Sequence, residues 1–155
     1  MTLQEVVARF NTTPFLFAGS GITRRYYGLP DWVGLLTHFA EKVKNDQFAF
    51  RYYESKVSEL EDSDKLPTIA SYIEKDFNEA WFNNLPGIRS ESENVQRSIA
   101  EGVSPFKAEI AEYINSISVV KNEYQEEVKK LQNIAKNNIS GVITTNYDCF
   151  FEILF

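Results

Sequence analysis

Two segments near opposite ends of the chain share one pattern, a short apolar run that ends in small polar residues. The first runs from Phe15 to Ala18 and continues into Gly19-Ser20-Gly21; the second covers residues 141–145 and continues into residues 146–148. Short apolar runs bounded by Pro, Gly and polar residues are typical of buried strands. Because the carboxyl ends of neighbouring parallel strands form the ligand crevice of an α/β sheet, the pair predicts a nucleotide site.

The long stretch between these two segments has the spacing of helices. Apolar residues recur every three or four positions, and strand patterns are absent from residue 46 to residue 138. A crossover between parallel strands needs only about a dozen residues, so this stretch is an insertion. The predicted fold class is therefore α/β: a Rossmann-like parallel sheet, incomplete here with two strands, and a large all-helical insertion at residues 46–138 between them.

Capping residues and apolar spacing predict the boundaries of the helices. Asp31 suits the N-cap of one helix, and Pro67 suits the first turn of another, after a polar break at residues 61–64. Ser104-Pro105 suits the start of a third helix, and Asp148 suits the cap of a last one. Further helices are expected at residues 2–10, 47–60 and 120–135.

Composition and charge exclude several classes of protein. The 155 residues fit one domain, here a partial one spanning residues 1–155. The formal net charge is −6 and basic residues are scattered among acids, so no nucleic-acid partner is expected. The single cysteine, Cys149, excludes an internal disulfide and a four-cysteine zinc site. Neither a leader peptide nor a membrane span is recognisable, which predicts a cytoplasmic protein without a membrane partner.

The glycine turn and the polar segment after the second strand are the candidate binding residues. Glycines directly after a strand let the backbone approach a pyrophosphate, although Gly19-Ser20-Gly21 also suits a plain structural turn. The dehydrogenase fingerprint needs a third glycine where this chain has Arg24. Asn146 and Asp148 can point into the crevice. The structural alternative is a turn in which Asn146 is left-handed and Asp148 caps the next helix.

Together these motifs resemble the SIR2 family. Ala18-Gly19-Ser20-Gly21, followed by Gly28-Leu29-Pro30-Asp31-Trp32, resembles the sirtuin patterns G-A-G-x-S and G-I-P-D-F-R. Residues 144–148 resemble T-Q-N-I-D, with Thr145 at the Gln position. The closer resemblance is to the SIR2-like NAD-hydrolysing domains of bacterial anti-phage defence proteins. These carry A-G-[AS]-G-[IVL]-S, G-x-P-x-W and T-T-N-Y-D-x-L-x-E in the same strand-loop-helix context.

The resemblance implies that NAD is the substrate and that it is hydrolysed to nicotinamide and ADP-ribose, which depletes NAD in an infected cell. The implied catalytic residue is Asn146, which would orient the ribose hydroxyls or the attacking water. The implied NAD-binding residues are Ala18, Gly19, Ser20, Gly21, Asp31, Trp32, Thr145 and Asp148.

The family pattern also assigns parts of NAD to these residues. Gly19-Ser20-Gly21 would face the phosphates, and Asp148 would contact the nicotinamide amide. Asp31 and Trp32 would lie in the loop over the nicotinamide and its ribose. Each has a structural alternative as well, since Asp31 suits a helix N-cap and Trp32 suits a helix core.

The chain departs from the family pattern at three points. The family's catalytic His follows T-N-Y-D, whereas the one His of this chain is His38, inside a predicted helix. Val33 replaces the Arg of G-I-P-D-F-R. The zinc cysteines of deacylating sirtuins are absent, as in defence-type members, which favours NAD hydrolysis without zinc. We therefore expect a chain that is truncated before the catalytic His and is inactive alone, with the rest of the domain or further domains as partners.

Two other functions are compatible with the sequence. One is a non-catalytic sensor or assembly module that binds NAD or ADP-ribose. The other is a helical interaction domain without a ligand. The sequence also leaves a homo-oligomer open.

Overall fold

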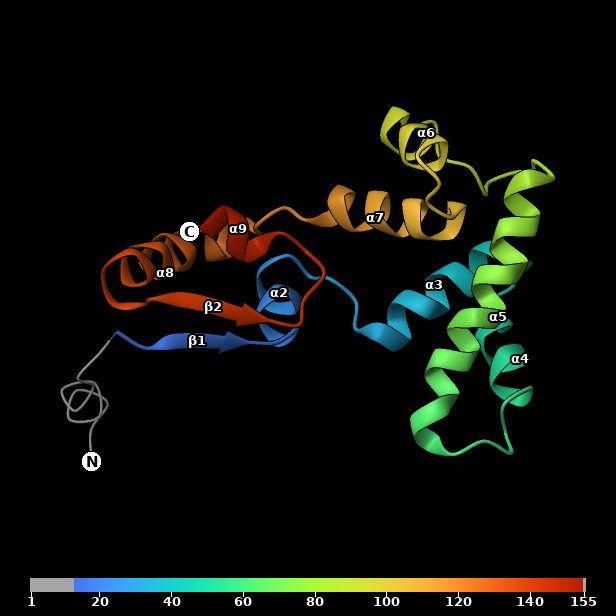
Figure 1. Ribbon diagram of the computed structural model, residues 1–155, viewed down its shortest axis with the longest axis horizontal. Helices are drawn as coiled ribbons and strands as arrows, with labels where there is room; N and C mark the ends of the chain where they lie inside the picture. Colours follow the sequence, from blue (N-terminus) through green and yellow to red (C-terminus); the bar gives the residue numbers. More distant parts are fainter. Residues whose placement is uncertain (1–12, 155) are drawn as a thin grey trace. The chain divides into compact units, whose positions relative to one another are not determined.

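The computed structural model describes residues 13–154, so the helix expected at residues 2–10 lies outside the described residues. The chain divides into two compact units (Figure 1). The sheet unit comprises the described residues up to Leu29 and from Ile117 onward, and the helical unit comprises residues 30–116. The elements are β1 (Phe15–Ala18), α2 (Gly21–Tyr26), α3 (Trp32–Lys44), α4 (Ala49–Ser55), α5 (Asp62–Phe82), α6 (Glu93–Ala100), α7 (Pro105–Ile117), the short 3-10 helix η1 (Asn122–Tyr124), α8 (Gln125–Asn138), β2 (Gly141–Thr144) and α9 (Phe150–Leu154).

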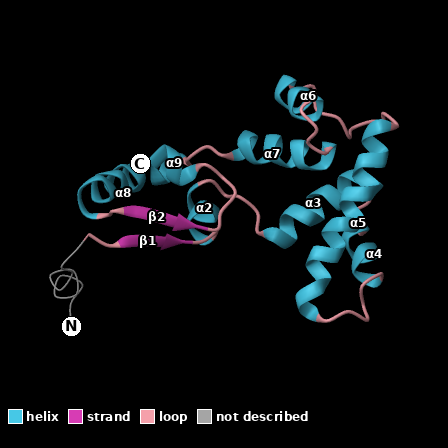
Figure 2. Ribbon diagram, in the orientation of Figure 1, coloured by secondary structure: helices cyan, strands magenta, loops and turns pink. Residues whose placement is uncertain are grey.

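Strands β1 and β2 run side by side and in parallel (Figure 1, Figure 2). Phe15 pairs with Gly141 and Ala18 pairs with Thr144, so the two strands end at the same edge of the sheet. Most of the other elements of the described chain are helices. An α/β chain with a two-stranded parallel sheet and a helical stretch between the strands is therefore confirmed.

One face of this sheet is exposed, and here the prediction of buried strands is wrong. Phe15 is 65% exposed, Phe17 71% and Ile143 53%, while Ala18 on the other face of β1 is buried. Side chains alternate between the two faces of a strand, and Phe17 pairs with Ile143, so their side chains share one face. An apolar run without alternation predicts burial on both faces, but in the sheet unit only one face of the strands is covered.

Aromatic rings and one carboxylate hold α2, α8 and α9 together in the sheet unit. Tyr26 of α2 stacks on Phe150 of α9 with ring centroids 5.3 Å apart. Its hydroxyl donates to Glu127 of α8 at 2.9 Å, and Arg25 donates to the same carboxylate at 2.8 Å. The hydrogen bond from Arg25, followed by that from Tyr26, holds the pKa of Glu127 below its usual value. The helix after β1 is thereby fixed to the helices on either side of β2.

The helical unit has an aromatic core of its own, built by α3, α4, α5 and α7. Phe39 packs edge-on against Phe77 and Phe106, with ring centroids 5.5 and 5.4 Å away. The fully buried members of this core include Leu35, Leu36, Phe39, Ala40, Tyr53, Val57, Ile69, Ile73 and Phe77. Their spacing of three and four residues along α3 and α5 is the amphipathic pattern that predicts these helices.

The boundaries of the helical unit differ from the sequence prediction in several places. Helix α5 begins at Asp62, so the polar break expected at residues 61–64 is wrong, because acidic residues such as Asp62 and Asp64 also stabilise the first turn of a helix. Pro67 consequently lies inside α5 and not in its first turn. Helix α6 was not predicted. The unit also begins and ends earlier than the insertion expected at residues 46–138, since α3 belongs to it and α8 does not.

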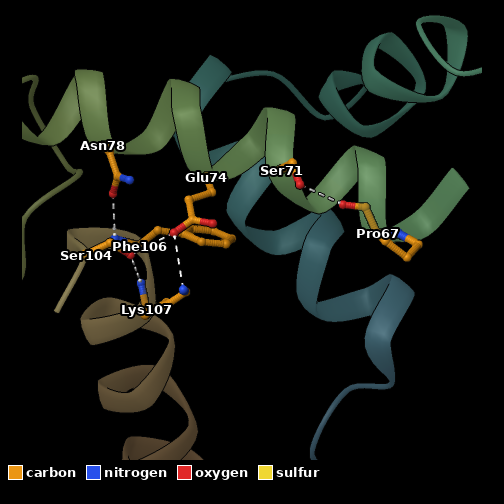
Figure 3. A network of polar contacts seen from close by, with 7 residues as sticks. All are labelled: Pro67, Ser71, Glu74, Asn78, Ser104, Phe106 and Lys107. Atoms are coloured by element: carbon orange, nitrogen blue, oxygen red, sulfur yellow. Dashed lines mark hydrogen bonds and ion pairs between the residues drawn. The ribbon is translucent and has the colours of Figure 1, made fainter. Parts of the chain in front are cut away.

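Side chains of α5 hold the start of α7 (Figure 3). Asn78 accepts a hydrogen bond from the backbone N–H of Phe106 at 2.9 Å, and Glu74 accepts one from the Ser104 hydroxyl at 2.8 Å. Ser104 also caps the helix, because its Oγ accepts from the N–H of Lys107 at 3.4 Å. The predicted start of a helix at Ser104-Pro105 is confirmed. Over the described residues, none of the helices is both long and apolar enough to cross a membrane.

Replacing Asp76 with Asn is expected to make the helical unit less sensitive to acid. Lys44 and Tyr53 donate to Asp76 Oδ2 at 2.7 and 2.8 Å. Burial opposes ionisation of this carboxyl, but the two hydrogen bonds outweigh it and hold the pKa of Asp76 below its ordinary value. Such a group contributes stability above its unfolded pKa, about 3.9, and this is lost as the pH falls through the folded value.

Urea unfolding between about pH 7 and about pH 2 measures this effect. As the pH is lowered, the free energy of unfolding should fall less for Asp76→Asn than for the wild type, although the variant is less stable at neutral pH. An identical fall in both proteins would show that the Lys44–Asp76–Tyr53 contacts do not carry the acid response.

Candidate functional site

The two motif segments meet at the carboxyl edge of the sheet. Because β1 and β2 are parallel and in register there, the turn after Ala18 lies beside the segment after Thr144. The side-chain nitrogen of Asn146 lies 3.4 Å from the carbonyl oxygen of Gly19 and 3.4 Å from Thr23 Oγ1. The prediction that the glycine turn and Asn146 lie close together is therefore confirmed.

Thr23 is a site residue that the sequence does not predict. It lies in the first turn of α2 and is buried, with only 2% of its surface exposed. Its hydroxyl donates a hydrogen bond to the Ser20 carbonyl at 3.2 Å. That leaves the oxygen lone pairs to accept from Asn146. A threonine at this spacing suits an exposed helix position equally well, so only the tertiary contact identifies it.

Asn146 has one half of its amide engaged and the other half unpaired. Gly19 offers a carbonyl, which only accepts, so the NH₂ group of Asn146 faces it. The side-chain oxygen Oδ1 is buried and has no hydrogen-bond partner among the described residues. The backbone N–H of Asn146 donates to Thr144 Oγ1 at 3.0 Å, and Asn146 is not among the residues with positive φ. The structural alternative of a left-handed Asn146 is therefore wrong.

A buried, unpaired acceptor is unfavourable by about 1–3 kcal/mol, so this oxygen suits a donor supplied by a ligand. Both hydrogen bonds of the amide nitrogen are long, at 3.4 Å.

The two glycines of the turn are not required by the fold of the described residues. Neither Gly19 nor Gly21 has a positive φ, and a Cβ built on either would meet no atom within 4 Å. Ser20 between them is exposed and makes no side-chain cap to α2. Glycines that neither backbone conformation nor crowding explains are typical of positions where a ligand approaches the backbone. The turn is therefore open on the side of both glycines.

The remaining predicted residues of the sheet unit have structural roles or exposed positions. Asp148 is buried and accepts a hydrogen bond from the N–H of Phe150 at 3.0 Å, so its predicted role as the cap of α9 is confirmed. Burial raises the pKa of the neighbouring Tyr27, and the charge of Asp148 adds to this. Thr145 is exposed and Ala18 is buried at the end of β1.

Asp31 and Trp32 belong to the helical unit and not to the unit that carries the other predicted site residues. Asp31 is the N-cap of α3, as predicted, because its Oδ1 accepts from the N–H of Gly34 at 2.8 Å. Trp32 is 42% exposed, so the alternative that it belongs to the helix core is wrong. It occupies the first position of α3, one turn before the buried pair Leu35 and Leu36.

His38, the one histidine of the sequence, also lies in the helical unit. Its ring stacks on Tyr113 of α7 with centroids 4.3 Å apart. Burial against these neighbours lowers the pKa of His38, and the nearby Lys42 ammonium lowers it further. A packing role for His38 fits its predicted position within a helix.

Comparisons of the chain with protein-family models, with curated proteins and with solved structures found no match. Function is therefore inferred from the residues of the site and from the motifs that they resemble.

Proposed function

We propose that the sheet unit is the NAD-binding part of a SIR2-like domain. In this proposal β1 and β2 belong to a Rossmann-like parallel sheet, and the helical unit is an insertion between them. The motif order A-G-S-G, G-L-P-D-W and T-T-N-Y-D supports it, as does the position of the first and last motifs at one edge of a parallel sheet.

The observation that carries the proposal is the state of the Asn146 amide. Gly19 and Thr23 hold its nitrogen, while the buried Oδ1 is left without a partner among the described residues. An oriented acceptor of this kind suits a hydroxyl group, such as those of a ribose, or a water molecule. A structural turn needs no such acceptor, since an unpaired buried oxygen destabilises the fold.

The other residues would bind and orient the substrate. Gly19 and Gly21 leave the turn open, so the pyrophosphate of NAD could approach the backbone closely. Asp148 would act on the nicotinamide amide through the carboxylate oxygen that does not cap α9, since Oδ1 already accepts from Phe150. Hydrolysis of NAD releases nicotinamide and ADP-ribose, and its proposed role is NAD depletion in anti-phage defence.

Binding without hydrolysis is the second candidate function, and one observation favours it. The family's catalytic His has no counterpart among residues 149–155, and the one His of the chain stacks on Tyr113 in the helical unit. The sheet unit therefore offers an oriented amide but no imidazole to remove a proton from water or a hydroxyl. The 155-residue chain is expected to bind NAD without measurable turnover.

Calorimetry with NAD and with ADP-ribose tests both candidates. Replacing Asn146 with Ala should weaken binding of both ligands about tenfold, because about 1.4 kcal/mol of hydrogen-bond energy is lost. Asn122→Ala, in the exposed η1 turn of the same unit, is the matched control and should bind like the wild type.

Release of nicotinamide, followed in parallel, separates a hydrolase from a sensor. If neither ligand binds the wild-type chain, the NAD proposal is wrong. If both bind and nicotinamide accumulates, the chain is a hydrolase whose base is not a histidine of the sheet unit.

A further inference from the structure

A surface hollow of about 380 Å³ lies in the helical unit, where α3 passes into α4. Its lining consists of Lys44, Asp46, Phe48, Ala49 and Tyr52. The volume is within the range of small-ligand sites, and the proposed NAD site uses none of these residues. The hollow thus combines an ammonium, a carboxylate and two aromatic rings.

The two aromatic side chains of the hollow are exposed. Phe48 is 59% exposed and Tyr52 48% exposed, although neighbouring Ala49 and Tyr53 are buried in the core. The Tyr52 ring has the Lys44 and Lys56 ammonium groups 5.3 and 4.4 Å from its centroid. Among the described residues no cation lies over the ring of Phe48, so its apolar surface is open to a flat apolar group.

The two charged groups are held in fixed positions. Lys44 Nζ lies 2.7 Å from Asp76 Oδ2, which orients the ammonium while two of its three N–H groups remain available. Asp46 Oδ1 accepts from the N–H of Phe48 at 2.6 Å, and its second oxygen makes no hydrogen bond within the described chain. Charged side chains that are already held in place lose little conformational entropy when a ligand binds, so this cost of binding is small.

We propose that this hollow binds an aromatic α-amino acid in its zwitterionic form. The ligand's carboxylate would contact Lys44, its ammonium group would contact Asp46, and its ring would pack against Phe48. A nucleotide fits less well, because Asp46 would face its phosphates. An apolar peptide segment also fits less well, because it would cover both charges without pairing them.

Titration of the ¹⁵N-labelled 155-residue chain with L-phenylalanine tests the proposal by NMR. Amide signals of Asp46 and Phe48 should shift and saturate in or below the millimolar range, a reasonable affinity for so small a ligand. Two analogues lack one charge each: 2-phenylethylamine has no carboxylate and 3-phenylpropionate has no ammonium group. Each should bind at least about fivefold more weakly than L-phenylalanine, since one charge-assisted contact is missing.

Variants locate the site. Asp46→Asn keeps the acceptor for the Phe48 N–H but removes the charge, and Phe48→Ala removes the ring; each should weaken binding at least about fivefold. Phe82→Ala, an aromatic residue that is 64% exposed outside the hollow, is the control and should bind like the wild type. Circular dichroism confirms that each variant is folded. The proposal is overturned if L-phenylalanine shifts no signal of the hollow, or if either analogue binds as tightly as the amino acid.

Discussion

Phe39→Ala is expected to lower the free energy of unfolding of the helical unit by about 3–5 kcal/mol. Phe39 is 1% exposed and touches the rings of Phe77, Phe106 and Tyr113, with centroids 5.4–5.9 Å away. When the ring is removed, α3, α5 and α7 cannot move together to fill the space, because each helix is held by further contacts. The loss therefore includes the transfer energy of the ring and the cost of the cavity that it leaves.

Tryptophan fluorescence during urea unfolding measures this loss in the helical unit alone, since both tryptophans of the sequence, Trp32 and Trp81, lie there. Phe82→Ala is the matched control: its ring is 64% exposed, so the free energy of unfolding should change by less than about 0.5 kcal/mol. A loss below about 1 kcal/mol for Phe39→Ala would contradict the packing of α3 against α5 and α7.

Thr23→Val is expected to weaken NAD binding about tenfold, provided that the proposed function is correct. Valine has nearly the shape of threonine but no hydroxyl. The side-chain nitrogen of Asn146 therefore loses one of its two hydrogen-bond acceptors and keeps only the Gly19 carbonyl. Leaving this partly buried N–H without an acceptor costs about 1–3 kcal/mol. Thr23 is thus a positioning residue that acts through Asn146.

The conservative variant Thr23→Ser should retain the affinity of the wild type because it retains the hydroxyl. Thr37→Val, which removes a hydroxyl on α3 in the helical unit, is the control. A second readout does not depend on NAD: the NMR signals of the Asn146 side-chain NH₂ should move in Thr23→Val and stay in place in Thr23→Ser. If these signals stay in place in both variants, the Thr23–Asn146 contact is absent, whatever the ligand.

The helical unit shows how far local patterns predict a fold. The apolar spacing of Leu35, Leu36 and Phe39 places α3, and Asp31 and Ser104 mark helix starts, because capping and amphipathic burial depend on residues only a few positions apart. The start of α5 is less predictable. Acidic residues stabilise either a polar loop or a first helical turn, and only the packing of Leu66 and Ile69 on the core selects the helix.

The exposed face of the sheet shows the opposite case. Phe15 and Phe17 belong to an apolar run that is typical of a strand buried on both faces, yet both side chains are exposed. Burial depends on which elements cover a strand and not on the strand itself. Their spacing of two residues places them on one face, but no local signal tells whether that face is covered.

For the candidate site, the sequence by itself determined the residue types: a glycine turn after one strand, and Asn146 and Asp148 after another. It also determined that both segments follow strands, because strand and turn signals are local. Only the tertiary structure decided the register in which the two strands pair and that Thr23 holds the Asn146 amide. These contacts join residues more than a hundred positions apart, and local spacing does not encode such contacts.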